Sequence, residues 1–235
     1  MKKEKEKNNK SFPWQKVLIV AFAVVFALMF IINYLMTAGT LQYFRGVRAN
    51  DTVTIDLTLR DARGLPVLTT DQDTYRNGIM SGNMPFYTAP LTVRAGYYDN
   101  PPVTGIAAQN YYLNQGGQEM KFGLLGDELN GLDQGVLAMK TGEKKTVSLG
   151  AADPEIILMK NYEFTAMGGN FTVIGVGDLI PLGISETPMV SGMEGMNETP
   201  TNAVWRVGTV INKTADSIEV QHLYPTADIM IRSIK

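Results

Sequence analysis

The chain has 235 residues, with 21 Lys and Arg against 23 Asp and Glu, one histidine and no cysteine. The lack of cysteine excludes disulfides and a thiolate nucleophile, and the single histidine argues against a metal site, so we expect no cofactor. After the N-terminal flank, 15 basic and 21 acidic residues leave a net charge of −6. This balance argues against nucleic acid as a partner, because phosphate binding needs clustered Lys and Arg.

An apolar segment near the start predicts a transmembrane helix over 17–36. Val17 to Ile32 contains no charged or polar side chain, and about 20 mainly apolar residues suffice to cross the hydrocarbon of a bilayer. The flank 1–16 carries six lysines against two glutamates. The positive-inside rule therefore predicts a single-pass protein of the cell membrane, with a cytoplasmic N-terminus and an extracellular C-terminal domain. A cleaved signal peptide is the alternative, disfavoured by the poor cleavage site at 36–38.

The exported part begins with a predicted hairpin. Apolar and polar side chains alternate from Val53 to Leu59, a two-residue period typical of a half-buried strand. Asp61 to Gly64 supplies a turn, and Leu65 to Leu68 is the expected returning strand. The following segment, 70–118, is rich in Asn, Gly, Tyr and Pro, and we expect a long surface insertion with one short strand at 91–94.

Periodic patterns typical of helices and strands resume in the second half of the chain. Apolar residues at near-helical spacing predict one short helix over 127–139, capped by Asp127 and ended by Gly142. Further strands are expected at 144–149, 171–176, 205–212, 217–223 and 229–234. Several strands with a single short helix favour an antiparallel α+β fold.

Three segments of the chain carry a resemblance to a known family. The run from Gly126 to Leu149, above all its Met139-Lys-Thr-Gly-Glu-Lys turn into a strand, resembles the core of FKBP-type peptidyl-prolyl cis–trans isomerases. The stretch from Asp51 to Leu59, followed by Gly64, resembles the opening hairpin of that family. Asp153-Pro-Glu155 resembles the Pro-Glu that precedes the family's flap.

The resemblance implies a domain layout. An FKBP-like domain would cover 49–158, interrupted by the insertion 70–118, with a curved antiparallel sheet around the helix. The segment 159–223 resembles the insert-in-flap chaperone domain of the two-domain (SlyD-like) branch, a small and mostly β inserted domain. The closing strand of the FKBP-like domain would then lie at 226–235.

The chemistry of this family suits the composition. Turning an X-Pro bond means crossing a barrier of about 18–20 kcal/mol that is set by amide resonance. A pocket that excludes water and favours the twisted amide lowers this barrier without a nucleophile or a metal. The resemblance therefore implies rotamase activity, a chemistry that is compatible with a chain without cysteine and without an expected metal site.

The positions that match the family's pocket are mostly aliphatic here. The family's strand tyrosine falls at Leu57, its Phe-Asp pair at Val67-Leu68, its tryptophan at Leu132 and the Ala-Tyr of its flap at Ile157-Leu158. The candidate substrate-binding residues are Leu57, Val67, Leu68, Phe122, Leu129, Leu132 and Leu158, and no catalytic residue is assigned. The same side chains suit a hydrophobic core equally well, so the sequence leaves enzyme activity open.

The leading hypothesis is a membrane-tethered FKBP-type isomerase and folding chaperone. It would bind unfolded or proline-containing segments of exported proteins. The alternative is a non-catalytic envelope interaction protein that reuses the fold, with the insertion 70–118 as its binding surface.

Overall fold

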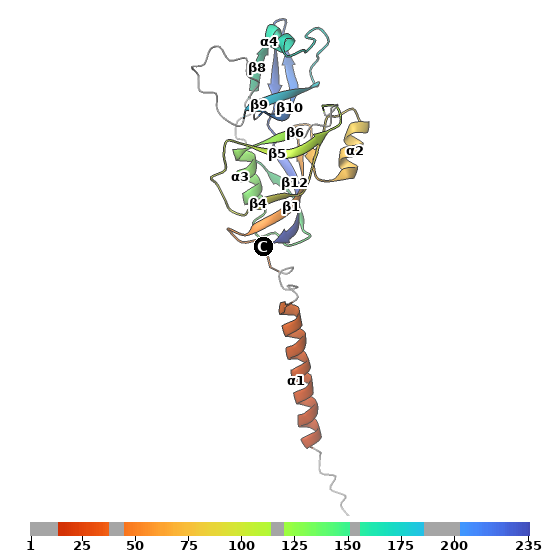
Figure 1. Cartoon of the computed structure of the whole chain (residues 1–235), viewed down its shortest axis with the longest axis vertical. Coiled ribbons are helices and arrows are strands. Elements are labelled where there is room, and N and C mark those ends of the chain that lie inside the picture. The colour runs from red at the N-terminus through yellow and green to blue at the C-terminus, as the bar shows by residue number, and fades with distance from the viewer. Residues whose placement is uncertain (1–13, 38–44, 114–119, 151–155, 186–202) are drawn as a thin grey trace, which may run out of the picture. The chain divides into compact units, whose positions relative to one another are not determined.

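The computed structural model describes residues 14–37, 45–113, 120–150, 156–185 and 203–235 (Figure 1). It divides the chain into two units, 1–45 and 46–235. In the first unit, helix α1 spans Trp14–Thr37, and its segment Val17–Tyr34 has a mean hydropathy of 2.7 with no residue buried. The predicted range 17–36 lies within α1, which is long and apolar enough to cross a membrane as an anchor or to act as a signal sequence.

The described part of unit 46–235 has an α+β fold built on one curled sheet of twelve strands (Figure 1). The strands are β1 (Thr52–Arg60), β2 (Pro66–Thr69), β3 (Phe86–Thr88), β4 (Leu91–Arg94), β5 (Val103–Asn110), β6 (Met120–Leu125), β7 (Lys144–Ser148), β8 (Ile156–Lys160), β9 (Leu179–Ser185), β10 (Ala203–Lys213), β11 (Ser217–Gln221) and β12 (Thr226–Ile234). The helices are α2 (Gln72–Met80), α3 (Gly126–Gly135) and α4 (Asn161–Ala166). The strand order is β7-β12-β1-β2-β3-β5-β6-β10-β11-β8, with β4 also paired to β1 and β9 to β10.

The predicted hairpin and closing strand are confirmed. In β1 the alternate residues Val53, Ile55, Leu57 and Leu59 are buried, as the two-residue period requires. The turn to β2 passes through Gly64, whose positive φ of 79° favours glycine. On its other side β1 pairs antiparallel with β12, so the last strand of the chain lies beside the first.

The sheet is mixed, where the sequence predicted an antiparallel one. β2 runs parallel to β3, and β6 runs parallel to β10. The first parallel pair arises because the insertion 70–118 is structured: α2 carries the chain back so that β3 enters alongside β2. Asp71 starts this helix by accepting hydrogen bonds from the backbone N–H groups of Asp73 and Thr74. Only β4 was expected there, because the other elements are short and interrupted by Pro and Gly.

Helix α3 is shorter than predicted. It ends at Gly135, and Ala138 takes a positive φ of 63°, which turns the chain toward β7 before the expected end at 139. Its Gly131 is required by close packing, because a Cβ there would lie 2.6 Å from the Cα of Leu149. The helix therefore packs tightly against the chain that follows β7.

Unit 46–235 contains two clusters of buried apolar side chains. The larger, here called the main core, lies between α3 and the strands β1, β2, β6, β7 and β12. The smaller, here called the second core, is formed by β8 to β11 with Phe164 of α4 and Phe171. The predicted strand 171–176 is wrong: this segment turns, and β8 and β9 supply strands that the sequence did not indicate.

Candidate functional site

Six of the seven predicted pocket residues lie together in the main core. Leu57, Val67, Leu68, Phe122, Leu129 and Leu132 are each at most 9 % exposed. Leu158 lies apart from them, in β8, and is 53 % exposed. The space between α3 and the sheet is thus occupied by the side chains that were candidates to line a pocket.

An ion pair that the sequence did not indicate is buried beside this core. The Arg206 guanidinium of β10 contacts both carboxylate oxygens of Glu128 in α3, at 2.6 and 2.9 Å, and neither side chain exceeds 4 % exposure. Arg206 also donates to the carbonyls of Gly123 and His222, each at 2.6 Å. The pair therefore joins β6, α3, β10 and the segment after β11.

Tyr224 completes this buried cluster. The Arg206 guanidinium lies 4.3 Å from the centroid of its ring, which stacks on Phe122. Its hydroxyl donates to the Val207 carbonyl and accepts from the Val207 N–H, at 3.0 and 3.1 Å. Burial raises the pKa of Tyr224 to about 12. A phenol that keeps its proton near neutral pH and is hydrogen-bonded to the backbone both as donor and as acceptor is a structural group.

The four strands β9, β10, β11 and β8 form a sheet with two different faces. One face packs on the second core through Val210, Val220 and Ile157, which are cross-strand partners. On the opposite face Thr209 pairs with Gln221, and Gln221 pairs with Ile156. We call this second surface the open face; its residues are Leu179, Val207, Thr209, Ile211, Glu219, Gln221, Ile156 and Leu158.

A mainly apolar cavity of about 270 Å³ lies at the β9–β10 end of the open face. The turn between β1 and β2 and the adjoining Val67 of β2 form part of its lining, together with Leu179, Val207 and Tyr224. Arg63 fixes this turn by pairing with Asp61 at 2.8 Å and donating to the Gly177 carbonyl at 2.7 Å. Val67 is therefore the one predicted pocket residue that borders this cavity.

At its other end the open face leaves apolar side chains in contact with solvent. Ile156 and Leu158 of β8 are 44 and 53 % exposed. Ile211 of β10, which lines the cavity, is 36 % exposed. β8 is also the last strand of the sheet among the described residues, so one row of its backbone groups has no strand partner there. An exposed apolar strand at a sheet edge is a template for pairing with another extended chain.

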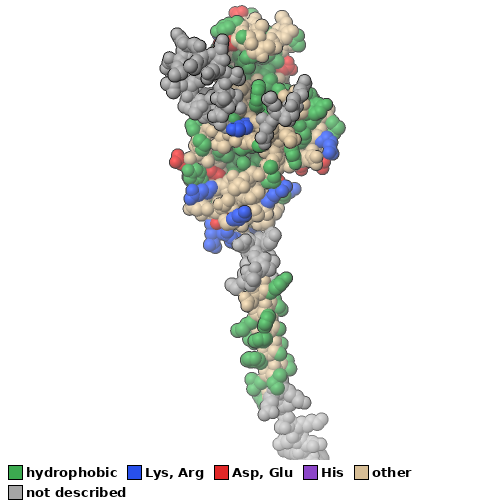
Figure 2. Space-filling model, in the orientation of Figure 1, with side chains coloured by type: hydrophobic (Ala, Val, Ile, Leu, Met, Phe, Trp, Pro, Cys, Tyr) green, Lys and Arg blue, Asp and Glu red, His purple; other side chains and the backbone are tan. Residues whose placement is uncertain are grey.

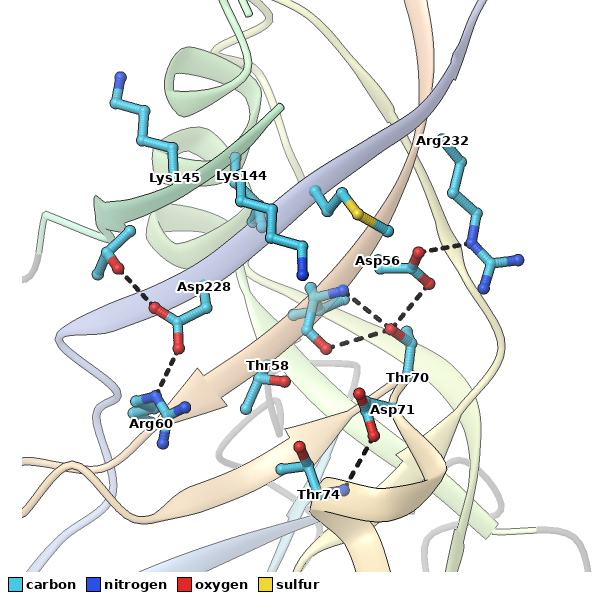
Figure 3. Close-up of a pocket in the computed structure, with 14 residues that line it drawn as sticks. Asp56, Thr58, Arg60, Thr70, Asp71, Thr74, Lys144, Lys145, Asp228 and Arg232 are labelled. Atoms are coloured by element: carbon cyan, nitrogen blue, oxygen red, sulfur yellow. Dashed lines mark hydrogen bonds and ion pairs between the residues drawn. The ribbon is translucent and has the colours of Figure 1, made fainter. Parts of the chain in front are cut away.

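A second hollow, of about 620 Å³, is polar and lies on the outer side of β7, β12 and β1, with the start of α2 as one wall (Figure 3). Asp56 pairs with Arg232 at 2.6 Å, and Asp228 pairs with Arg60 at 2.7 Å. Although burial acts in the opposite direction, hydrogen bonds from Thr146 and Arg60 leave the pKa of Asp228 below its ordinary value. Both carboxylates are thus engaged by arginine side chains.

The described residues offer no arrangement for metal chemistry, because no three His, Asp or Glu side chains among them gather around one point. The open face thus offers exposed apolar side chains beside an apolar cavity, and the groove of Figure 3 offers charged side chains. A scan against protein-family models and a search of curated proteins found no match to this chain.

Proposed function

We propose that this protein is a membrane-tethered FKBP-type folding factor that binds unfolded segments of exported polypeptides on its open face. The order of elements supports the kinship: a β1–β2 hairpin, α3, a turn into β7, and β12 returning beside β1. The segment from β8 to β11 lies between β7 and β12 in sequence and has its own buried cluster, as an insert-in-flap domain would. Helix α1 would be the anchor that holds the protein at the membrane.

One observation carries the binding role: exposed apolar residues of the open face continue into an apolar cavity. An extended segment could pair its backbone with the β8 edge while its side chains cover Ile156, Leu158 and Ile211. An apolar side chain of the segment could enter the cavity beside Val67. Such a site selects extended apolar chains, which folded proteins do not present.

Prolyl isomerisation is the weaker part of this proposal. Six of the seven positions that match the family's pocket are packed in the main core, which leaves the proline ring no room between α3 and the sheet. The cavity beside Val67 is mainly apolar and larger than a proline ring, and the two charged residues in its lining, Asp61 and Arg63, are paired with each other. We therefore expect binding to dominate over catalysis.

The test uses the full chain in nanodiscs and a fluorescent, permanently unfolded polypeptide as the probe. The double substitution Ile156→Lys and Leu158→Lys should weaken binding by about tenfold or more, as loss of central apolar contacts does at interfaces. The matched control, Tyr162→Lys with Val173→Lys, changes two side chains that are 72 and 76 % exposed but lie outside the open face. Equal binding by the two variants would overturn the proposal.

A specific observation also supports the alternative of a non-catalytic envelope interaction protein. The start of α2, which belongs to the insertion 70–118, forms a wall of the polar groove in Figure 3. A refolding assay on a proline-limited substrate, with aggregation followed in parallel, separates the hypotheses. Acceleration supports an isomerase, suppressed aggregation alone supports a chaperone, and neither effect favours the envelope protein.

A further inference from the structure

One end of unit 46–235 is strongly basic, although the unit as a whole is acidic. Residues 46–235 carry 14 Lys and Arg against 21 Asp and Glu. Figure 2 shows Lys and Arg side chains gathered at the end that carries the C-terminus (Figure 1). We call this surface the basic end and define it by exposed cations from four segments of the chain.

Backbone hydrogen bonds hold these segments together. Residues 47–52 bond to Met139, to Ala95 and to Lys235, which brings Arg48, Arg94, Lys140 and Lys235 to one surface. The Gly142 N–H donates to the Ile231 carbonyl, and the Ile231 N–H donates to the Glu143 carbonyl. These bonds place Lys144, Lys145 and Arg232 next to the first four cations.

Few acids oppose these seven cations. Asp56 is engaged by Arg232 at 2.6 Å, and the Glu143 carboxylate accepts the backbone N–H of Lys140 at 2.9 Å. Asp51 accepts the backbone N–H of Arg48 at 2.8 Å. The side chains of Lys140, Lys144 and Lys145 make no ion pair with any described residue, and Figure 3 shows Lys144 extending over the groove. The basic end therefore presents excess positive charge to solvent.

The covalent chain keeps this end close to a bilayer if α1 remains in the membrane. Eight residues separate Thr37 at the end of α1 from Gly46. Even a fully extended chain of this length reaches only about 30 Å. Arg48 follows two residues after Gly46, so the basic end is the part of the unit that is closest to the anchor along the chain. Tethering makes even weak attraction effective, because the second contact becomes intramolecular.

We propose that the basic end docks on the anionic headgroups of the membrane that holds α1. Clustered Lys and Arg next to a transmembrane helix are attracted by anionic lipids over about one Debye length, ~8–10 Å at moderate salt. Docking would direct the β8–β11 sheet away from the bilayer, since it lies at the opposite end of the same unit (Figure 1). The open face would then be presented to chains that arrive from solution.

The test measures amine acetylation at individual lysines, by mass spectrometry, on the full chain in nanodiscs. One set of nanodiscs is made of phosphatidylcholine, and the other contains one part in four of phosphatidylglycerol. The expected result is several-fold slower acetylation of Lys140, Lys144, Lys145 and Lys235 on the anionic discs, reversed by high salt. Lys160, exposed in β8, is the internal reference and should react equally on both.

Charge reversal tests the assignment of the surface. The double variant Lys140→Glu with Lys144→Glu should strongly reduce the lipid-dependent protection of Lys235. The control variant Arg76→Glu with Lys121→Glu makes the same change in net charge outside the basic end, keeps Lys160 as the reference, and should retain the protection. Equal acetylation on both kinds of disc, failure of the chain to insert into discs, or the same protection by inorganic phosphate on neutral discs would each overturn the proposal.

Discussion

The main core and the second core are built from the same kinds of side chain, but they bury them to different extents. The main core contains 26 buried residues and also accommodates a buried ion pair and the ring of Tyr224. The second core contains eight buried residues, and the strands around it leave Ile156, Leu158 and Ile211 exposed. A small cluster cannot cover both faces of its sheet. The comparison teaches that the larger region buries most of the apolar surface, and that the smaller one leaves the exposed apolar side chains on which the proposed binding depends.

The largest expected effect comes from breaking the buried ion pair between Arg206 of β10 and Glu128 of α3. Arg206→Met leaves the Glu128 carboxylate buried without its partner, and stability should fall by about 3–5 kcal/mol. The double variant Arg206→Met with Glu128→Leu removes both charges and should recover most of this loss. Urea unfolding of the full chain in detergent measures both. A single variant as stable as wild type would mean that water reaches the pair.

A smaller effect compares the regions directly through one type of side chain. Replacing Leu132, which is fully buried on α3, with alanine should cost about 2–5 kcal/mol of stability, because a cavity remains. Leu158→Ala on the open face should change stability by about 0.5 kcal/mol or less. Thermal unfolding of the two variants provides the measurement. If Leu158→Ala is the more destabilising, the open face is covered in the folded protein.

The smallest expected effect tests whether water reaches the buried carboxyl of Asp133 in α3. Burial raises the pKa of Asp133, although Asn100 donates a hydrogen bond to it at 2.8 Å. A carboxyl whose pKa is higher in the folded than in the unfolded chain destabilises the fold at neutral pH. This cost is relieved as the pH falls through the folded-state pKa toward the unfolded value of about 3.9.

Asp133→Asn should therefore be more stable than wild type at neutral pH, and it should lose more stability than wild type on acidification. Melting temperatures measured at steps between neutral pH and about pH 4 follow the difference. Parallel curves for the two proteins would show that the Asp133 carboxyl is hydrated.

Local patterns in the sequence were enough to predict the frame of the main core. The alternation from Val53 to Leu59 and the turn before Lys144 specify their own structures, because the next few residues decide them. The apolar run of α1 is equally local. The α+β class follows from these elements together.

The candidate site was less predictable because it depends on pairings between distant residues. Arg206 reads as an ordinary exposed strand residue, and its partner Glu128 lies 78 positions away. Leu158 matched the family's flap by position, but its exposure depends on β8 being the last strand among the described residues. The strands of the insertion 70–118 were hard to predict because they pair with β1, β2 and β6, which lie outside the insertion. The burial of Arg206 and the exposure of Leu158 follow from strand pairings between residues that lie far apart in the sequence.

Strand β10 belongs to both regions at once. Val207 lies in the main core, and Val210, three residues later on the same strand, lies in the second core. A cassette that removed 156–221 would also delete Arg206 and leave the Glu128 carboxylate stranded. Because β10 is shared, force applied to β8 should reach α3 through β10 and the Arg206–Glu128 pair, and it should not move the β8–β11 sheet as a separate body. In a pulling experiment the two regions should yield as one event.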